Sequence, residues 1–202
     1  MREKEILENY ITISKEEIES FMNKIDADAL QKAKEMIVKA EANGNRVHIS
    51  GIGKPSHVAE YAASLFSSTG TPAYVLDATE AIHGSSGQVV AGDVVIAISN
   101  SGETEELKAT VRTLKQNKAV LIAVTGDVDS WLAKECDVCL FAGVKREGDV
   151  LNKPPRSSII AEMIVLQGLS ILLQEYKNIT PSEYVKWHPG GSLGKSIREE
   201  NK

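Results

Sequence analysis

The sequence is poor in the residues that mark several common classes of protein. Two cysteines among 202 residues are too few for a disulfide framework, so we expect a reducing compartment. Aromatic residues make up only 5%, which does not favour a base-stacking or cellulose-binding surface. Positive charge is not in excess: 23 Lys and Arg face 28 Asp and Glu, a net charge of −5. A protein that binds a nucleic acid backbone needs a basic stripe, and we predict no nucleic acid partner.

Long apolar runs and targeting signals are also lacking. We find no apolar stretch that approaches the ~18 to 20 residues of a membrane span. The first ten residues carry acidic side chains and no apolar core of a secretory signal. These observations predict a cytoplasmic protein with no membrane contact. The length and the 42% hydrophobic content suit one domain with a full core.

What the sequence does contain is an alternation of short apolar runs and helical patterns. Two helices are expected within residues 1–43, and in the second of them apolar residues recur every three or four positions. Five runs that are hydrophobic throughout follow, separated by helical patterns, which predicts an α/β domain with a five-stranded parallel sheet flanked by helices. The expected strands are 47–50, 73–76, 94–99, 119–125 and 138–142, and the expected helices are 4–22, 27–42, 56–68, 104–116, 130–134 and 157–176. We expect the tail, residues 178–202, to be irregular with a short helix.

The most informative segment follows the third expected strand, where Ser99, Asn100, Ser101 and Thr104 surround Gly102. Ligands of doubly wound sheets sit beyond the carboxyl ends of the strands. Free backbone N–H groups at a helix start attract anions, and the hydroxyl groups add donors. We therefore predict a phosphate site. A helix cap built on the same hydroxyl groups is the alternative, and both can hold because a cap needs only one of them.

The turn after the first expected strand reads Gly-Ile-Gly-Lys, residues 51–54. Its two glycines suggest a close approach of the backbone to a ligand, and the sequence places Lys54 at the carboxyl edge of the sheet. Alone, Lys54 is equally compatible with a solvated side chain. The spacing matches neither a P-loop nor the dinucleotide-binding GxGxxG pattern, which argues against an NAD-dependent oxidoreductase.

Four further residues are candidates, each with an ordinary alternative. His83 follows the second strand and could be a satisfied polar residue of a loop. Glu106 could be a favourable acid in the first turn of a helix, and Glu147 could be a solvated loop residue. His188 opens the glycine-rich stretch 188–194, an unusual composition for a disordered tail, so we favour a functional histidine there.

Two other features are assigned to structure. Cys136 and Cys139 have CxxC spacing, but no second pair exists and they run into an apolar strand. Buried thiols explain them better than a redox or zinc site, and we predict no metal site. His48 lies inside the first strand and is expected in the core or on a face of the sheet.

Five motifs together resemble the sugar isomerase (SIS) domain, and within it the arabinose-5-phosphate isomerases, from about residue 30 onward. The serine-rich motif is general to SIS domains, whereas the Thr-Gly-Thr-Pro and His-Pro-Gly-Gly motifs are specific to the arabinose-5-phosphate branch. The motifs are Gly-Ile-Gly-Lys at 51–54, Ser-Ser-Thr-Gly-Thr-Pro-Ala at 67–73, Glu-Ala-Ile-His-Gly at 80–84, Ser-Asn-Ser-Gly-Glu-Thr at 99–104 and His-Pro-Gly-Gly-Ser-Leu-Gly at 188–194.

The resemblance implies a single SIS domain over 1–202 with a flavodoxin-like three-layer sandwich. It also implies a homotetramer whose sites are shared between subunits, and aldose–ketose isomerisation of a sugar phosphate without metal or cofactor. The catalytic residues of the family match Lys54, Glu106, Glu147, His83 and His188. The phosphate would be held by Ser99, Asn100, Ser101, Thr104 and Gly53.

The same resemblance implies roles in a cis-enediol mechanism. Glu147 is the leading candidate for the base, and His188 would open the ring or move hydroxyl protons. Lys54 would stabilise the enediolate, with Glu106 orienting it or acting as a second acid or base. The most closely matching reaction interconverts D-arabinose 5-phosphate and D-ribulose 5-phosphate.

Departures from the family pattern keep two alternatives open. Ser85 stands where the family has an acidic residue. The family's Pro-Thr-Ser-Ser-Thr stretch corresponds to residues 155–159 here, with Arg156 in place of the first threonine. Another phosphosugar could therefore be the substrate. The tandem CBS modules that usually follow the His-Pro-Gly-Gly motif are not among these residues. A sugar-phosphate-binding regulator is the second alternative. The absence of a helix-turn-helix segment, the net charge of −5 and the retained catalytic chemistry argue against it.

Overall fold

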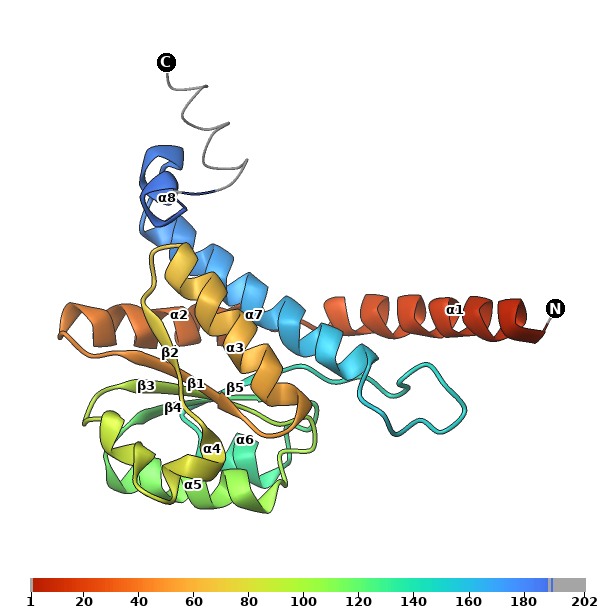
Figure 1. Cartoon of the computed structure of the whole chain (residues 1–202), viewed down its shortest axis with the longest axis horizontal. Helices are drawn as coiled ribbons and strands as arrows, with labels where there is room; N and C mark the ends of the chain where they lie inside the picture. Colours follow the sequence, from red (N-terminus) through yellow and green to blue (C-terminus); the bar gives the residue numbers. More distant parts are fainter. Residues whose placement is uncertain (1, 189, 191–202) are drawn as a thin grey trace.

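A computed structural model describes residues 2–188 and residue 190. Five parallel strands form one sheet in the order β2-β1-β3-β4-β5 (Figure 1). The predicted α/β class and the five-stranded parallel sheet are therefore confirmed. The strands are β1 Val47–Gly51, β2 Ala73–Val75, β3 Val94–Ile98, β4 Val120–Thr125 and β5 Val138–Phe141.

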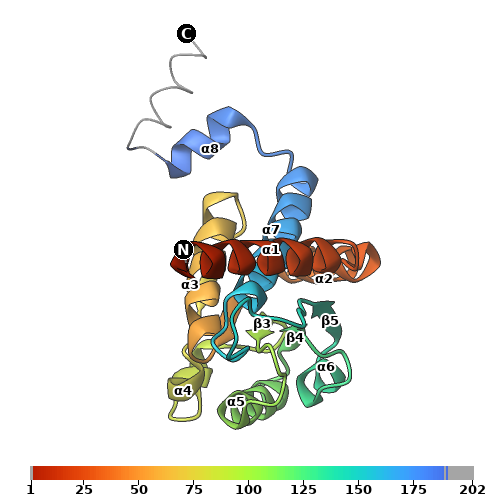
Figure 2. The same ribbon diagram turned by 90° about the vertical axis from the view of Figure 1, so that its right-hand side faces the viewer.

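Helices cover both faces of the sheet, which gives three layers (Figures 1 and 2). One face is covered by α2 (Ala27–Ala42), α3 (Lys54–Ser68) and α7 (Ser157–Tyr176), and the other by α4 (Ala78–Ala81), α5 (Glu105–Gln116) and α6 (Trp131–Glu135). Alternate residues of β3 serve the two cores: Ile96 and Ile98 pack under α3 and α7, whereas Val95 and Ala97 pack over α5. Both faces of the sheet are therefore shielded from water by helices, which explains why the strands are hydrophobic throughout.

Two short elements between β2 and β3 were not expected from the sequence. They are α4 and the 3₁₀ helix η1 (Ser85–Gln88). The signal for α4 is Asp77, whose side chain accepts hydrogen bonds from the backbone N–H groups of Thr79 and Glu80. In addition, α3 begins at Lys54 rather than at residue 56, because Pro55 fits the first turn of a helix.

The N-terminal helix α1 (Arg2–Met22) is buried against the body mainly in its second half, while Tyr10 in its first half lies beside Gly148. Phe21 and Glu17 are buried, whereas Ile6, Leu7 and Ile11 are more than half exposed. Figure 1 shows the beginning of α1 standing away from the sheet and its covering helices. The predicted pair of N-terminal helices is present, with an apolar stripe that the described part of this chain does not cover.

Helix α7 corrects the expectation that no segment is long and apolar enough to span a membrane. It has 20 residues, and an 18-residue stretch of it has a mean hydropathy of 1.5, so by length and composition alone it could cross a membrane. In this structure α7 packs against α1, α2 and α3 and contributes nine buried residues to the core. Its apolar character is that of a central core helix.

The tail contains α8 (Pro181–Trp187), the short helix expected within residues 178–202. Thr180 and Glu183 begin it with a capping box. Of the glycine-rich motif 188–194, residue 189 and residues 191–194 lie outside the described residues.

His48 lies in the core, as predicted, and forms a buried pair with Asp93 before β3. The distance from His48 Nε2 to Asp93 Oδ2 is 3.3 Å, and both side chains are almost completely buried. Asp93 also accepts hydrogen bonds from the backbone N–H groups of Val90 and Arg46 and from the Asn45 amide, at 2.9–3.1 Å. This carboxylate joins the chain before β1 to the chain before β3.

The two cysteines are free thiols that are partly buried, in agreement with the structural interpretation. Burial, followed by the nearby charge of Asp137, raises the pKa of the Cys136 thiol to about 12. The thiol is therefore protonated at neutral pH and a poor nucleophile. Within residues 2–188 and 190, no group of three or more His, Cys, Asp and Glu side chains is placed to hold a metal ion.

Candidate active site

The strand order places two of the predicted motifs side by side. The chain passes from β1 to β2 on one side and then returns to β3 on the other side of β1. Gly51, the last residue of β1, pairs with Ile98, the last residue of β3. The glycine turn after β1 and the serine loop after β3 therefore leave the sheet at the same level. This is the switch point at which parallel α/β sheets open a crevice for ligands.

The serine loop is held by its own hydroxyl groups. Ser99 Oγ accepts a hydrogen bond from the Gly102 N–H at 3.1 Å and lies 3.1 Å from Thr104 Oγ1. Ser101 is exposed, and its Oγ accepts from the N–H of Glu103 at 3.2 Å. The structure therefore brings the hydroxyl groups of Ser99 and Thr104 together just before α5, with the Ser101 hydroxyl group exposed in the same loop.

These contacts bear on the alternative of a helix cap. Thr104 occupies the N-cap position of α5, but its side chain makes no capping hydrogen bond. Ser101 bonds outside the helix, so neither hydroxyl group provides the alternative cap of α5. Among the described residues, the first-turn N–H groups of this 12-residue helix are left without a side-chain cap. Such an end attracts an anion.

Two glycines allow the loops to take these positions. Gly53 has φ 68° and ψ −131°, a conformation that favours glycine, where the backbone turns from β1 into α3. Gly102 has φ 65°, and a Cβ there would overlap the side chain of Ser130 before α6. A side chain at position 102 would push the serine loop away from its place.

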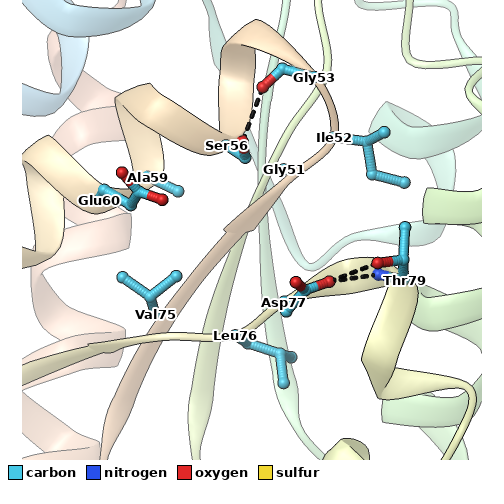
Figure 3. Close-up of a pocket in the computed structure, with 10 residues that line it drawn as sticks. All are labelled: Gly51, Ile52, Gly53, Ser56, Ala59, Glu60, Val75, Leu76, Asp77 and Thr79. Carbon is cyan, nitrogen blue, oxygen red and sulfur yellow. Dashed lines mark hydrogen bonds between the residues drawn. The ribbon is translucent and has the colours of Figure 1, made fainter.

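A small cavity lies on the β2 side of the glycine turn. Its volume is about 170 Å³, and its walls come from the turn, the first part of α3 and the end of β2 (Figure 3). Asp77 contributes a carboxylate, with Thr79 Oγ1 donating to it at 2.7 Å. That hydrogen bond and those from the backbone lower the pKa of Asp77. His83 follows α4 in the same connection and is exposed.

Lys54 lies between this cavity and a second hollow on the α7 side. It is exposed at the start of α3 and, with His57, lines a hollow of about 310 Å³. The far wall comes from Pro155, Ile159 and Met163 at the start of α7. The structure thus places Lys54 opposite the loop that carries Glu147.

Glu147 is buried, with 7% of its surface exposed, so its interpretation as a solvated loop residue is wrong. Its Oε2 accepts hydrogen bonds from the backbone N–H groups of Arg156, at 2.6 Å, and Ser158, at 3.2 Å. Arg156 is the N-cap residue of α7 and provides no side-chain cap of its own. A carboxylate is therefore fixed by hydrogen bonds at the N-terminus of α7.

The support of this loop was not expected from the sequence. Glu17 on α1 accepts hydrogen bonds from the Lys145 backbone N–H and from Arg146 Nε, both at 2.7 Å. Burial opposes the charge of Glu17, but these hydrogen bonds and the charge of Arg146 outweigh it and lower the pKa of Glu17. The contact spans more than 120 residues of chain, so no local pattern could reveal it.

The two acids Glu103 and Glu106, at the start of α5, have different surroundings. Glu106 is exposed on the first turn of α5, close to the serine loop. Glu103 is engaged in structure: its Oε1 accepts the Trp131 N–H at 2.7 Å, and its Oε2 lies 2.6 Å from Lys108 Nζ. Of these two acids, Glu106 is therefore the one available to a ligand at this edge of the crevice.

His188 is not brought to Lys54 within one chain. It ends α8 and stacks on Tyr184, with ring centroids 3.9 Å apart. The preceding Trp187 lies next to Gly70, beyond the end of α3, whereas Lys54 starts that helix. A 15-residue helix is about 22 Å long, so the two residues lie at opposite ends of α3 (Figure 1).

Comparisons with known proteins agree with this geometry. The model of the SIS domain matches residues 42–172. The arabinose 5-phosphate isomerase KdsD of Francisella tularensis subsp. tularensis is 36% identical over 182 residues, which cover 90% of this chain and 55% of that protein. The KdsD of Pseudomonas aeruginosa is 35% identical over 187 residues, covering 93% and 56%. The chain thus spans about half the length of these curated relatives.

A solved structure also matches over nearly its whole length. The structure of E. coli CFT073 c3406 in complex with arabinose 5-phosphate superimposes with a TM-score of 0.81 at 32% identity. The match covers 92% of this chain and 96% of that chain. Together with the parallel sheet and the serine loop at its switch point, these matches show that the chain belongs to the SIS domain family.

Proposed function

We propose that this protein is a phosphosugar isomerase that interconverts D-arabinose 5-phosphate and D-ribulose 5-phosphate. The observation that carries the proposal is the serine loop before an uncapped α5, at the same sheet edge as Lys54. Support comes from the KdsD relatives, which are named as arabinose 5-phosphate isomerases, and from the neighbouring structure in complex with arabinose 5-phosphate.

The phosphate fits the serine loop because hydroxyl groups and first-turn N–H groups converge there. Ser99, Asn100, Ser101, Thr104 and Gly53 would surround it. Holding the phosphate supplies binding energy remote from the reacting carbons, and this orients the sugar. The other end of the sugar then extends toward Lys54 and the start of α7, where Glu147 is fixed.

The chemistry is a proton transfer between adjacent carbons. After ring opening, Glu147 would remove the proton from C2 of the aldose while the carbonyl oxygen on C1 gains negative charge. Lys54 would stabilise that charge in the cis-enediolate, and Glu106 would orient Lys54 or act as a second acid or base. A proton then returns to C1, and the hydroxyl proton of O2 passes to O1, which gives the ketose. No net proton or electron is gained.

His83 and His188 would have different roles in the site. His83 lies in the connection after β2 and would contact the hydroxyl groups of the sugar. His188 would act in ring opening or hydroxyl proton transfer, and its place at the far end of α3 means that it would serve the site of another subunit. We therefore propose a homotetramer with shared sites. The exposed Ile6, Leu7 and Ile11 of α1 support association with a second copy.

The test of the activity is a panel of pentose and hexose phosphates incubated with the pure protein in D₂O. Proton NMR should show ribulose 5-phosphate formed from arabinose 5-phosphate, with solvent deuterium at C2 of the aldose after the reverse reaction. Turnover of another phosphosugar alone would move the assignment to that substrate, as Ser85 and Arg156 allow. Binding without turnover of any member would favour a sugar-phosphate sensor.

Removal of two hydroxyl groups should separate phosphate binding from chemistry. We expect Ser101→Ala with Thr104→Ala to raise KM by about 10²- to 10⁴-fold, because two lost hydrogen bonds to a charged group cost about 1.5 to 3 kcal/mol each. The measurement is KM for the phosphosugar together with calorimetry of inorganic phosphate. The matched control is Thr113→Ala, on the same helix away from the loop. Unchanged phosphate affinity in the double variant would contradict the assignment.

Shared sites predict complementation between two inactive variants. His188→Ala and Lys54→Met should each lose most turnover as pure proteins. Mixed after reversible dissociation, they should regain up to about a quarter of the wild-type rate, because some sites then combine Lys54 of one chain with His188 of another. Light scattering of each variant monitors assembly. A monomer, or no recovery in mixed oligomers, would remove the shared-site proposal.

A further inference from the structure

Glu162, in the second turn of α7, is a buried carboxyl group that the mechanism above does not use. Its side chain is completely inaccessible to solvent. Neither carboxyl oxygen makes a hydrogen bond to any residue that the structure describes. An ionised carboxylate in such a place costs several kcal/mol, and the group avoids that cost by keeping its proton.

Glu162 lies one helical turn from the contact that fixes Glu147. Ser158 donates its backbone N–H to Glu147 Oε2 at 3.2 Å, and Ser158 and Glu162 are four residues apart on one face of α7. Burial and then the nearby charge of Glu147 raise the pKa of Glu162 to about 8. The two carboxyl groups therefore lie within one turn of α7 of each other, near enough for the charge of Glu147 to act on Glu162.

The elements packed around α7 offer Glu162 no compensating cation among the described residues. Every titratable side chain of α2 and α3 is exposed or only partly buried. Helix α1 contributes one buried titratable group, Glu17, which is paired with Arg146. Arg146 and Lys145 are themselves exposed, and Asp149 of the same loop pairs with Arg156. The negative charge that faces Glu162 is that of Glu147.

We propose that Glu162 is a positioning residue for Glu147: near neutral pH the two carboxyl groups hold one proton, which resides on Glu162 and leaves Glu147 ionised and bonded at the start of α7. This inference rests on the proposed function in that Glu147 is the base. When Glu162 loses its proton to solvent at higher pH, two carboxylates face each other inside the protein. The repulsion between the two negative charges pushes Glu147 away from the N–H groups of Arg156 and Ser158.

The kinetic test compares pH profiles of kcat. In the wild type, kcat should fall above about pH 8, by up to tenfold per pH unit for a single ionisation. The glutamine side chain in Glu162→Gln has the same size as glutamate and cannot ionise. This variant should therefore keep kcat at pH 7 within about twofold and should not show the fall of kcat above about pH 8, the alkaline limb of the profile. Glu175→Gln, an exposed position on the same helix, is the matched control and should keep the limb. A limb that persists in Glu162→Gln, or is absent from the wild type, would overturn the proposal.

A second measurement does not depend on activity. In protein labelled with ¹³C at glutamate carboxyl carbons, one resonance should titrate near pH 8 and disappear in Glu162→Gln. In Glu147→Gln the same resonance should titrate at lower pH, because the neighbouring charge is gone. The proposed interaction between Glu162 and Glu147 would be overturned if no carboxyl group titrated above pH 6. It would also be overturned if Glu147→Gln left the titration of that resonance unchanged. A protein that isomerises no sugar but shows both NMR effects would refute the proposed function and retain the pair.

Discussion

Replacement of Glu147 by glutamine is expected to lower kcat by about 10²- to 10⁴-fold while the domain stays folded. A glutamine side chain keeps an oxygen that can accept the N–H groups of Arg156 and Ser158, which Glu147 Oε2 binds at 2.6 and 3.2 Å. It cannot take up a proton from the sugar. The substitution therefore separates the two roles that the structure allows for this carboxylate, general base and cap of α7.

The measurements are kcat with arabinose 5-phosphate and the thermal midpoint of unfolding. Glu147→Ala serves as the comparison, because it removes both the base and the cap and should lower Tm by several degrees, for a loss of about 0.5 to 2 kcal/mol. Near-normal kcat in Glu147→Gln would show that Glu147 only caps α7. The base would then have to be sought at Glu106, the exposed carboxylate at the serine loop.

Replacement of Asp93 by alanine should destabilise the fold by about 3 to 5 kcal/mol. Asp93 is completely buried and accepts hydrogen bonds from Val90, Arg46, Asn45 and His48. Alanine would leave these buried donors without an acceptor. Thermal unfolding should show a fall in Tm of roughly 10 °C.

Lowering the pH should reduce the stabilisation that Asp93 gives the folded state. Burial opposes the charge of Asp93, but its hydrogen bonds outweigh burial and lower its pKa below the ordinary value. The stabilisation is thus complete above the unfolded-state pKa near 4 and is lost as pH falls through the lower folded-state pKa. Urea titrations should show the gap between wild type and Asp93→Ala closing below about pH 4. Asp129→Ala, an exposed control, should stay within about 0.5 kcal/mol of wild type throughout. A gap that stays unchanged in acid would contradict this account.

The sequence predicted the sheet well because both faces of each central strand are covered. The run 94–98 is hydrophobic at every position, and alternate residues enter the two cores. The serine loop could be predicted equally well, since hydroxyl groups and a glycine after such a strand have few purely structural uses. Short elements escaped because α4 has four residues, too few to show a helical period.

The environment of the acids could not be predicted from the sequence. Glu147 lies in a charged segment of the sequence, but it is buried, and its carboxylate bonds to the backbone at the start of α7. Glu162 is one acid within an apolar helix, and only the packing around α7 shows that it has no hydrogen-bond partner among the described residues. Burial, and therefore charge state, depends on contacts between distant segments. Residue types alone predict which groups are present, not which of them keep a proton.

The contact between Glu17 and the 145–147 loop has a practical consequence for shortened versions of the chain. Helix α1 stands apart in Figure 1 and would be an obvious segment to delete, either to obtain a smaller protein or to ask whether the protruding helix drives assembly. Such a deletion would also remove the acceptor for the Lys145 N–H and for Arg146 Nε. Lost activity in a truncated protein would then report damage to the 145–147 loop as much as lost association. Point substitutions at Ile6 and Leu7, which leave Glu17 in place, are the cleaner way to test assembly.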